Sequence, residues 1–215
     1  MINTDLYIYV IGFFAQALFS SRLIIQWFLS EKQKQVVTPS LFWILSLLAS
    51  ILLFAYGHLR DDFAIMMGQS LTYFIYIRNL QLQNKWNQIH RLWQWTIYAF
   101  PGLVVIYYFN NNTLDLSQLF NGDNITIPLL VLGIISQSLF TFRFIYQWLY
   151  SEKNKHSVLP VGFWRLSALG AALILIYAIF RKDPVLFMGH STGLFIYIRN
   201  IMLSKSPTLP VNQTQ

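Results

Sequence analysis

The chain has 215 residues, of which 55% are apolar, 17% aromatic and only 11% charged. A soluble domain carries about 25% charged residues, so the composition predicts a protein of the lipid bilayer. The sequence contains no cysteine, which excludes disulfide scaffolds, thiolate metal sites and cysteine nucleophiles. The net charge of +7 lies mostly in short segments between apolar runs, a pattern typical of membrane orientation and anionic lipid contact rather than of nucleic-acid binding.

Seven apolar runs predict seven transmembrane helices and therefore an all-α, polytopic membrane protein. Most of the runs reach the ~20 residues that are needed to cross a bilayer. We expect the helices at residues 6–29, 41–59, 63–80, 92–109, 125–149, 161–180 and 184–203.

The first three and the last three runs belong to a tandem repeat. Residues 12–80 align with residues 133–201 without a gap, and 32 of the 69 positions are identical. Because three is an odd number, the single helix between the repeats restores the direction of the chain, and the two repeats insert parallel to one another. Repeats of this kind usually place the site between the two halves. The predicted units are a first three-helix repeat (1–80), a linker helix with an outer loop (81–124), a second repeat (125–203) and a cytoplasmic tail (204–215).

The distribution of lysine and arginine predicts the orientation in the membrane. Nine of these residues lie in the segments 30–40, 78–91 and 151–160 or near the C-terminus, and three lie on the opposite side. Positive residues favour the cytoplasmic side, so we expect the N-terminus in the periplasm and the C-terminus in the cytoplasm. All seven tryptophans fall near the same cytoplasmic boundary, where aromatic residues concentrate.

An arginine lies inside the first helix of each repeat, about seven residues before its cytoplasmic end. At 1.5 Å per residue, Arg22 and Arg143 would lie roughly 10 Å below the membrane surface. An arginine at a helix centre costs about 2.5–3.5 kcal/mol on insertion, so these two need a partner other than lipid tails. Glutamines accompany them, four residues later on the same face or six residues earlier: Gln26, Gln147, Gln16 and Gln137.

No carboxylate is predicted at the depth of the arginines, because all eight acidic residues fall at membrane edges or in loops. Two interpretations stay open. Either the arginines hold helices together and reach lipid headgroups, or they bind an anionic ligand. Phosphate suits the second interpretation, because the guanidinium fork binds it through two parallel hydrogen bonds.

The third helix of each repeat ends in a tyrosine and an arginine at the cytoplasmic face. Tyr76 and Arg78 occupy these positions in the first repeat, and Tyr197 and Arg199 occupy them in the second. We treat all four as candidate substrate contacts, the arginines as a second phosphate contact.

Three further polar residues are candidates with less support. Asp62 and Asp183 open the third helices, where a carboxylate favours the helix dipole; a gating role is the alternative. His190 aligns with Gln69 of the first repeat. A histidine here would titrate near neutral pH and contact substrate, or it would be a hydrogen-bonded packing residue.

A long motif runs through the second repeat. Its residues are Gln137-Ser-Leu-Phe-Thr-Phe-Arg143-Phe-Ile-Tyr-Gln147-Trp148-Leu-Tyr-Ser151-Glu152-Lys153, then Pro160, Phe163-Trp164, Asp183-Pro184, Gly189 and Ile196-Tyr-Ile-Arg199-Asn200. The motif resembles the lipid A biosynthesis N-terminal domain family. The first repeat matches more loosely, with Phe63 in place of Pro184 and Gln69 in place of His190.

This resemblance implies the bacterial inner membrane and the assembly of envelope glycolipids, because the domain is found fused to some lipid-A-disaccharide synthases. The sequence offers neither a nucleotide-binding glycine loop nor a carboxylate cluster for a metal, so we expect no enzymatic activity and no cofactor. The three-one-three order also resembles the SWEET and PQ-loop transporters. Their Pro-Gln signature would fall on Ala15-Gln16 and Ser136-Gln137, where the proline is missing.

The sequence therefore favours a transporter or flippase for an anionic lipid-linked sugar, a polyprenyl-phosphate glycoside. Its partners would be membrane lipids and membrane glycosyltransferases, and no nucleic acid. A SWEET-like facilitator of soluble sugars is one alternative, and a non-catalytic membrane subunit that recruits a glycosyltransferase is another. Proton relays inside a membrane use Asp, Glu or His. The acidic residues fall at membrane edges or in loops, and His190 occurs in one repeat only. We therefore expect downhill movement of the substrate without proton coupling.

Overall fold

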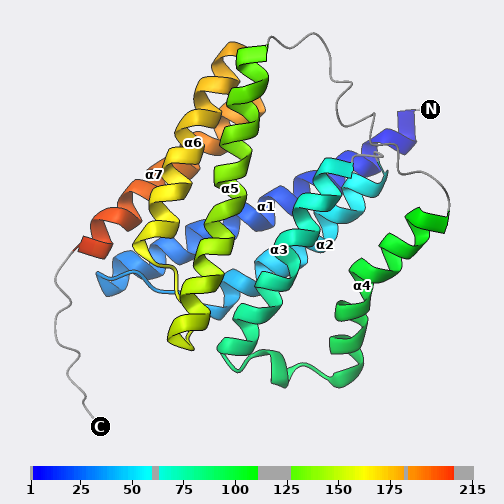
Figure 1. Ribbon diagram of the computed structural model, residues 1–215, viewed down its shortest axis with the longest axis horizontal. Helices are drawn as coiled ribbons and strands as arrows, with labels where there is room; N and C mark the ends of the chain where they lie inside the picture. Colours follow the sequence, from blue (N-terminus) through cyan, green and yellow to red (C-terminus); the bar gives the residue numbers. More distant parts are fainter. Residues whose placement is uncertain (1, 60–62, 111–126, 182–183, 206–215) are drawn as a thin grey trace.

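The computed structural model describes residues 2–59, 63–110, 127–181 and 184–205, and over these residues the fold is all-α with no strand (Figure 1). The helices are α1 (Ile2–Gln33), α2 (Ser40–Leu59), α3 (Phe63–Leu82), the 3-10 turn η1 (Trp86–Gln88), α4 (Arg91–Asn110), α5 (Ile127–Asn154), α6 (Val161–Arg181) and α7 (Pro184–Lys205). Over the described residues the predicted all-α class and the seven predicted helices are confirmed, with helix ends that differ by a few residues.

Two of these helices are long and apolar enough to cross a membrane. They are Val10–Gln33 and Val161–Phe180, and a third, Ser40–Tyr56, is apolar but shorter. The finding suggests membrane association only weakly, so the seven-span topology stays a prediction.

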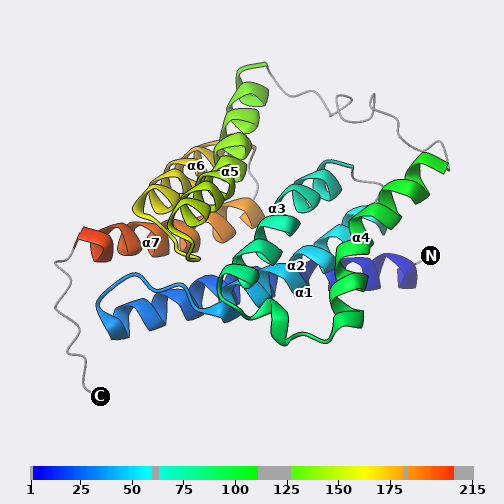
Figure 2. The ribbon, with the colours of Figure 1, turned by 60° about the horizontal axis from the view of Figure 1, so that its bottom comes forward.

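The six helices of the two repeats close into a ring (Figures 1 and 2). Within the first repeat, α2 packs between α1 and α3, and within the second, α6 packs between α5 and α7. The repeats meet at their outer helices, so that α1 contacts α7 and α3 contacts α5. We call these two contacts the α1–α7 seam and the α3–α5 seam. Bonds across both seams bring the C-terminal ends of these four helices together, so the repeats run parallel.

Aromatic residues form a core that continues from one repeat into the other. Trp43 and Trp164 are completely buried in their own repeats, and each packs with a ring-centroid distance of 6.1 Å against the tyrosine of the third helix, Tyr76 or Tyr197. Tyr76 then meets Phe144 of the other repeat edge to face at 5.4 Å. Aromatic pairs of this geometry contribute about 0.5–1.5 kcal/mol beyond their buried area, so this pair helps to fix the α3–α5 seam.

The chain turns sharply after α1, α3 and α5. Lys34, Asn84 and Lys155 have φ values of 53°, 55° and 58°, the left-handed conformation that commonly ends a helix. The loops after α1 and α5 then meet, because the backbone N–H of Leu159 donates to Thr38 Oγ1 at 3.1 Å. One end of the ring is therefore closed by chain from both repeats.

Helix α4 lies outside the ring against α3 (Figure 1). The Tyr73 hydroxyl donates to the Ile97 carbonyl oxygen at 2.9 Å, and the Trp86 and Tyr98 rings meet at 5.2 Å. The outer face of α4 exposes apolar and aromatic side chains, such as Trp95, of which 74% is accessible. Of the predicted outer loop at 110–124, residues 111–124 lie outside the described residues.

Candidate functional site

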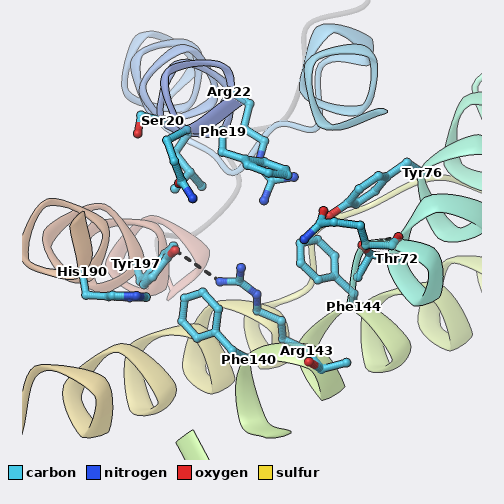
Figure 3. Close-up of a pocket in the computed structure, with 14 residues that line it drawn as sticks. Phe19, Ser20, Arg22, Thr72, Tyr76, Phe140, Arg143, Phe144, His190 and Tyr197 are labelled. Carbon is cyan, nitrogen blue, oxygen red and sulfur yellow. Dashed lines mark hydrogen bonds between the residues drawn. The ribbon is translucent and has the colours of Figure 1, made fainter. Parts of the chain in front are cut away.

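A central cavity of about 290 Å³ lies between the two repeats, inside the ring. Its walls come from α1, α3, α5 and α7, which are the four helices of the two seams (Figure 3). Ligand pockets commonly begin at about this volume. The residues that line it include Gln16, Phe19, Ser20, Arg22, Gln69, Tyr76, Phe140, Arg143, Phe144, His190 and Tyr197. We call this space the arginine cavity, because both intrahelical arginines lie in its wall.

Arg143 is held by two hydroxyl groups and two aromatic rings. Its Nη1 donates to Ser167 Oγ at 3.3 Å and to the Tyr197 hydroxyl at 3.2 Å. The guanidinium Cζ lies 3.6 Å from the centroid of Phe140 and 4.7 Å from that of Phe144. These rings attract the cation through their π faces and hold the guanidinium group at the cavity wall.

Arg22 repeats this arrangement with different distances. Its Nη1 donates to Ser46 Oγ at 2.5 Å, and its Cζ lies 4.5 Å from the centroid of Phe19. The Phe144 ring also lies near this arginine, with its centroid 5.4 Å from the Arg22 Cζ. The tyrosine ring that corresponds to Tyr197 is that of Tyr76, whose centroid lies 5.7 Å from Cζ. The two guanidinium groups thus approach one shared phenylalanine from opposite repeats.

Neither arginine has a carboxylate partner among the described residues, in which the ion pairs are Arg78–Glu152 and Arg199–Glu31. Both cavity arginines are only 5% exposed, and the Nε–H of each is buried without a hydrogen-bond partner in the described structure. Guanidinium groups offer five N–H donors, and a buried unpaired donor costs about 1–3 kcal/mol. The cavity therefore holds two positive charges with donor capacity to spare.

The far end of the cavity is polar and open. Gln16 and Ser20 line it and are exposed, in contrast to the buried arginines. Gln69 and His190 occupy corresponding positions on α3 and α7 and both line the cavity. The Gln69 Oε1 is buried without a partner, whereas the His190 ring meets Phe140 edge to face at 5.1 Å. The two repeats thus present different polar groups to one space.

Three candidate residues lack a described side chain. Gln137 lies in α5, and nothing is described of its side chain, while Asp62 and Asp183 lie outside the described residues. The described part of the chain contains no group of three or more histidine, aspartate or glutamate residues that would hold a metal ion.

Gln26 and Gln147 lie beyond the cavity, in reciprocal bonds that cross the two seams. Gln26 donates to Asn200 Oδ1 at 2.9 Å and accepts from its Nδ2 at 3.1 Å. Gln147 and Asn79 form the same pair at 2.8 and 3.1 Å. All four side chains are completely buried, and we call the two pairs the amide clasp. This placement differs from the sequence prediction, which put both glutamines on one substrate-facing surface with the arginines.

Serines of the same helices extend the clasp into the loops. Gln26 and Gln147 each donate to the serine four residues later, at 2.8 Å in both repeats. Those serines, Ser30 and Ser151, in turn accept the backbone N–H groups of Val37 and Val158, which anchors the loops after α1 and α5.

Arg78 and Arg199 are occupied by ion pairs at the same end of the ring. Each binds a glutamate of the other repeat with two nitrogens, Arg78 to Glu152 and Arg199 to Glu31. The side chain of Trp148 also donates to Glu152, at 3.2 Å. The hydrogen bond from Arg78 holds the pKa of Glu152 below its ordinary value of 4.5. The predicted second phosphate contact would have to compete with these glutamates.

Sequence reasoning did not single out the partners of these groups. Ser46 and Ser167 were not among the candidate residues, yet each accepts a hydrogen bond from an arginine. Asn79 and Asn200, which complete the amide clasp, were not among the candidates either. The sequence does repeat the Arg-Asn pair, as Arg78-Asn79 and Arg199-Asn200, and this repetition is the signal that could have found both asparagines.

The model of the lipid A biosynthesis N-terminal domain matches residues 11–81 and 132–202, which are the two repeats. The chain belongs to this family. Both arginines, both pairs of the amide clasp and both ion pairs fall within the matched segments. The site described above is thus built entirely from two copies of one lipid A biosynthesis N-terminal domain.

The chain is similar to curated proteins named lipid-A-disaccharide synthase. It is 30% identical to the one from Chlamydia pneumoniae over 209 residues, which are 91% of this chain and 33% of that protein. For Chlamydia caviae the identity is 29% over 213 residues, 94% of this chain and 34% of that protein. For the protein from Chlamydia abortus the identity is 31% over 207 residues, which are 91% of this chain and 33% of that protein. The chain spans about a third of the length of these relatives. No solved structure matches it.

Proposed function

We propose that this chain is a multi-pass protein of the bacterial inner membrane that binds an anionic lipid-linked sugar and moves it across the bilayer. The observation that carries the proposal is the pair of buried arginines, which share one cavity without a described counter-ion. A phosphate group would use the spare N–H donors through bidentate hydrogen bonds. The family is the lipid A biosynthesis N-terminal domain, and in lipid A biosynthesis phosphate and sugar occur together on membrane lipids.

Polar groups at the open end of the cavity suit the sugar. Gln16, Ser20 and Gln69 offer amide and hydroxyl groups around the mouth, and such groups donate and accept hydrogen bonds equally well. The aromatic rings beside the arginines offer flat apolar faces. A neutral sugar would leave both arginines without a counter-ion, which favours a phosphate-bearing ligand over a soluble sugar.

The direction of opening follows from the predicted topology, in which all seven helices cross the membrane. The positive residues of the loops after α1, α3 and α5 favour the cytoplasmic side, and the amide clasp and both ion pairs lie at this end of the ring. The exposed Gln16 lies at the opposite end of the cavity. We infer that the cavity is closed toward the cytoplasm and open toward the periplasm.

A second candidate function is a membrane subunit that recruits a glycosyltransferase. It is favoured by the relatives, because the chain matches about a third of proteins named lipid-A-disaccharide synthase. Such a subunit would depend on its cytoplasmic loops and on the exposed face of α4. It would tolerate changes at Arg22 and Arg143.

The test is ligand binding to the purified full-length protein in detergent. We expect polyprenyl phosphate to raise the midpoint of thermal unfolding, because a ligand of the folded state stabilises it by mass action. The uncharged polyprenol of the same chain length should raise it far less. Arg22→Gln and Arg143→Gln should each abolish the difference between the two lipids.

Transport is then measured as movement of a labelled polyprenyl-phosphate sugar between leaflets in proteoliposomes. Wild-type protein should accelerate the movement, and the double variant Arg22→Gln, Arg143→Gln should not. Equal stabilisation by polyprenol, or full transport by the double variant, would overturn the proposal. Loss of glycosyltransferase recruitment after changes to the cytoplasmic loops alone would support the second candidate.

A further inference from the structure

The two seams between the repeats are built from the same residues, yet corresponding side chains differ in their surroundings and exposure. In the α1–α7 seam the Trp27 ring meets Phe195 edge to face at 5.6 Å, and Ile198 is 42% exposed. In the α3–α5 seam the corresponding residues Trp148 and Phe74 line a cavity of about 510 Å³. We call this cavity the side groove.

Helix α4 accounts for the difference. Tyr98 of α4 forms part of the side-groove wall, and Ile77, which corresponds to Ile198, is only 1% exposed. The linker helix occurs once in the chain, so the α1–α7 seam has no equivalent of this wall. One of two near-identical seams has thus become a walled groove, while the other stays an open surface.

The side groove is apolar along most of its length and polar at one end. Phe74, Ile77 and Ile145 line it, and the Arg78–Glu152 ion pair lies at its end. An apolar groove of this size beside a charged pair suits a hydrocarbon chain. The same groove would leave a sugar or a phosphate with few polar partners.

The side groove and the arginine cavity lie on either side of the same helix contact. Tyr76 and Phe144 line the arginine cavity, and the residues that follow them, Ile77 and Ile145, line the side groove. The edge-to-face contact of Tyr76 with Phe144 at 5.4 Å lies at this boundary. A molecule with its charged head at the arginines would therefore need to pass only this aromatic pair to place its tail in the groove.

We propose that the side groove between α3, α4 and α5 is the binding site for the hydrocarbon tail of the phosphate-bearing lipid whose head occupies the arginine cavity. The inference rests on the proposed function and adds the side from which the lipid enters. Loading occurs through the α3–α5 seam at the cytoplasmic half of the membrane. In the α1–α7 seam the Trp27 ring lies against Phe195 instead.

The first test is photocrosslinking of the wild-type protein in nanodiscs. The probe is a polyprenyl phosphate with a diazirine in its tail, and crosslinked peptides are identified by mass spectrometry. We expect labelled peptides from α3, α4 and α5, around Ile77, Tyr98 and Ile145. Labelling concentrated on α1 and α7, around Ile24 and Ile198, would overturn the tail site.

The second test fills the groove and uses the duplicated seam as its control. Ile145→Trp narrows the side groove, whereas Ile24→Trp makes the same change at the corresponding exposed position. Each buried methylene of a lipid tail contributes about 0.8 kcal/mol, so loss of a few contacts should weaken binding of the long-chain phosphate about tenfold or more. Ile24→Trp should change it less than about twofold, since no tail contact is removed there.

A short prenyl phosphate with one isoprene unit separates the two proposals. It should bind wild type and Ile145→Trp equally, because its phosphate reaches the arginines without filling the groove. If it fails to bind the wild type, the proposed function fails. If it binds and a diazirine-bearing phosphatidylcholine labels the groove without competition from polyprenyl phosphate, only the tail site is overturned, because the groove then holds bulk lipid.

Discussion

The arginine cavity and the amide clasp are two regions of one ring in which polar side chains are buried. They differ in whether these side chains find hydrogen-bond partners. In the clasp, Gln26 and Gln147 find their partners in the other repeat, and each pair satisfies itself in both directions. In the cavity, Arg22 and Arg143 keep a buried N–H without a partner. Buried polar groups are normally paired, so the clasp has the features of structure and the cavity has those of a ligand site.

The degree of symmetry separates the same two regions. The clasp is nearly identical in both copies, with donor–acceptor distances that differ by 0.1 Å. The cavity is unequal, because Arg143 bonds to two hydroxyl groups and because His190 stands where the other copy has Gln69. Duplicated residues that keep one geometry hold the halves together, and those that diverge are free to distinguish the two ends of a ligand.

The largest effect on stability is expected from Asn79→Ala in the clasp. The substitution leaves the Gln147 Oε1 buried without its donor and removes the acceptor of the Ser157 hydroxyl. An unsatisfied buried group costs about 1–3 kcal/mol, so we expect a loss of about 3 kcal/mol. Asn200→Ala should cost about 2 kcal/mol, because Val36 stands in the position of Ser157.

Unfolding in detergent by heat or denaturant measures both variants of the clasp. The double variant Asn79→Ala, Gln147→Leu provides the control, because replacing both partners removes the unsatisfied amide. It should recover part of the stability that Asn79→Ala loses. A double variant whose loss of stability equals the sum of the losses of Asn79→Ala and Gln147→Leu would show that the clasp does not act as a pair.

The next largest effect concerns phosphate binding by the cavity. Arg143→Lys should weaken binding of polyprenyl phosphate about tenfold, because lysine cannot form the bidentate fork. Its stability should change by less than about 1 kcal/mol, since removing buried guanidinium donors that lack partners offsets the lost hydrogen bonds. Isothermal titration and thermal unfolding separate the two quantities. A variant that loses stability and keeps its affinity would make Arg143 a structural residue like those of the clasp.

A smaller effect is expected from the ion pairs beside the clasp. The side chain of Arg78 is 41% exposed and that of Glu152 26% exposed, so Glu152→Gln should cost at most about 1 kcal/mol. The hydrogen bond from Arg78 lowers the folded-state pKa of Glu152. Its contribution is therefore complete above the ordinary pKa of 4.5 and is lost as the pH falls through the lowered value. Unfolding measured across acidic pH should show this loss for wild type and not for Glu152→Gln.

The smallest effect is expected where the two repeats differ. His190→Gln gives the second repeat the residue that the first repeat has at position 69. We expect binding of polyprenyl phosphate to stay within about twofold, since glutamine preserves a hydrogen-bonding side chain at the cavity wall. Movement of the labelled lipid in proteoliposomes should continue without a pH gradient. Accumulation that required a gradient and vanished in this variant would assign His190 to proton coupling.

The helices were predictable from the sequence, and most of the polar pairing was not. Seven apolar runs and one repeat place every helix, because hydrophobic length and internal alignment are local signals. Gln26 and Asn200 are 174 residues apart, and the alignment alone leaves open whether Gln26 pairs with the asparagine of its own repeat or of the other. Ring closure decides this choice, because α1 packs against α7 instead of α3. The arginines could be recognised as unusual from the sequence, because the depth predicted for them in a membrane depends only on their position along the helix.

The bonds across the seams have a consequence for the ancestry of this chain. Each repeat supplies both the glutamine and the asparagine of the clasp, and both the glutamate and the arginine of the ion pairs. A surface that carries both halves of every bond is self-complementary and would form a two-fold symmetric homodimer from single repeats. In the predicted topology, three spans leave such a repeat with its ends on opposite sides of a membrane, and α4 is the segment that lets two copies become one polypeptide. Fusion then frees the subunits from the requirement of being identical.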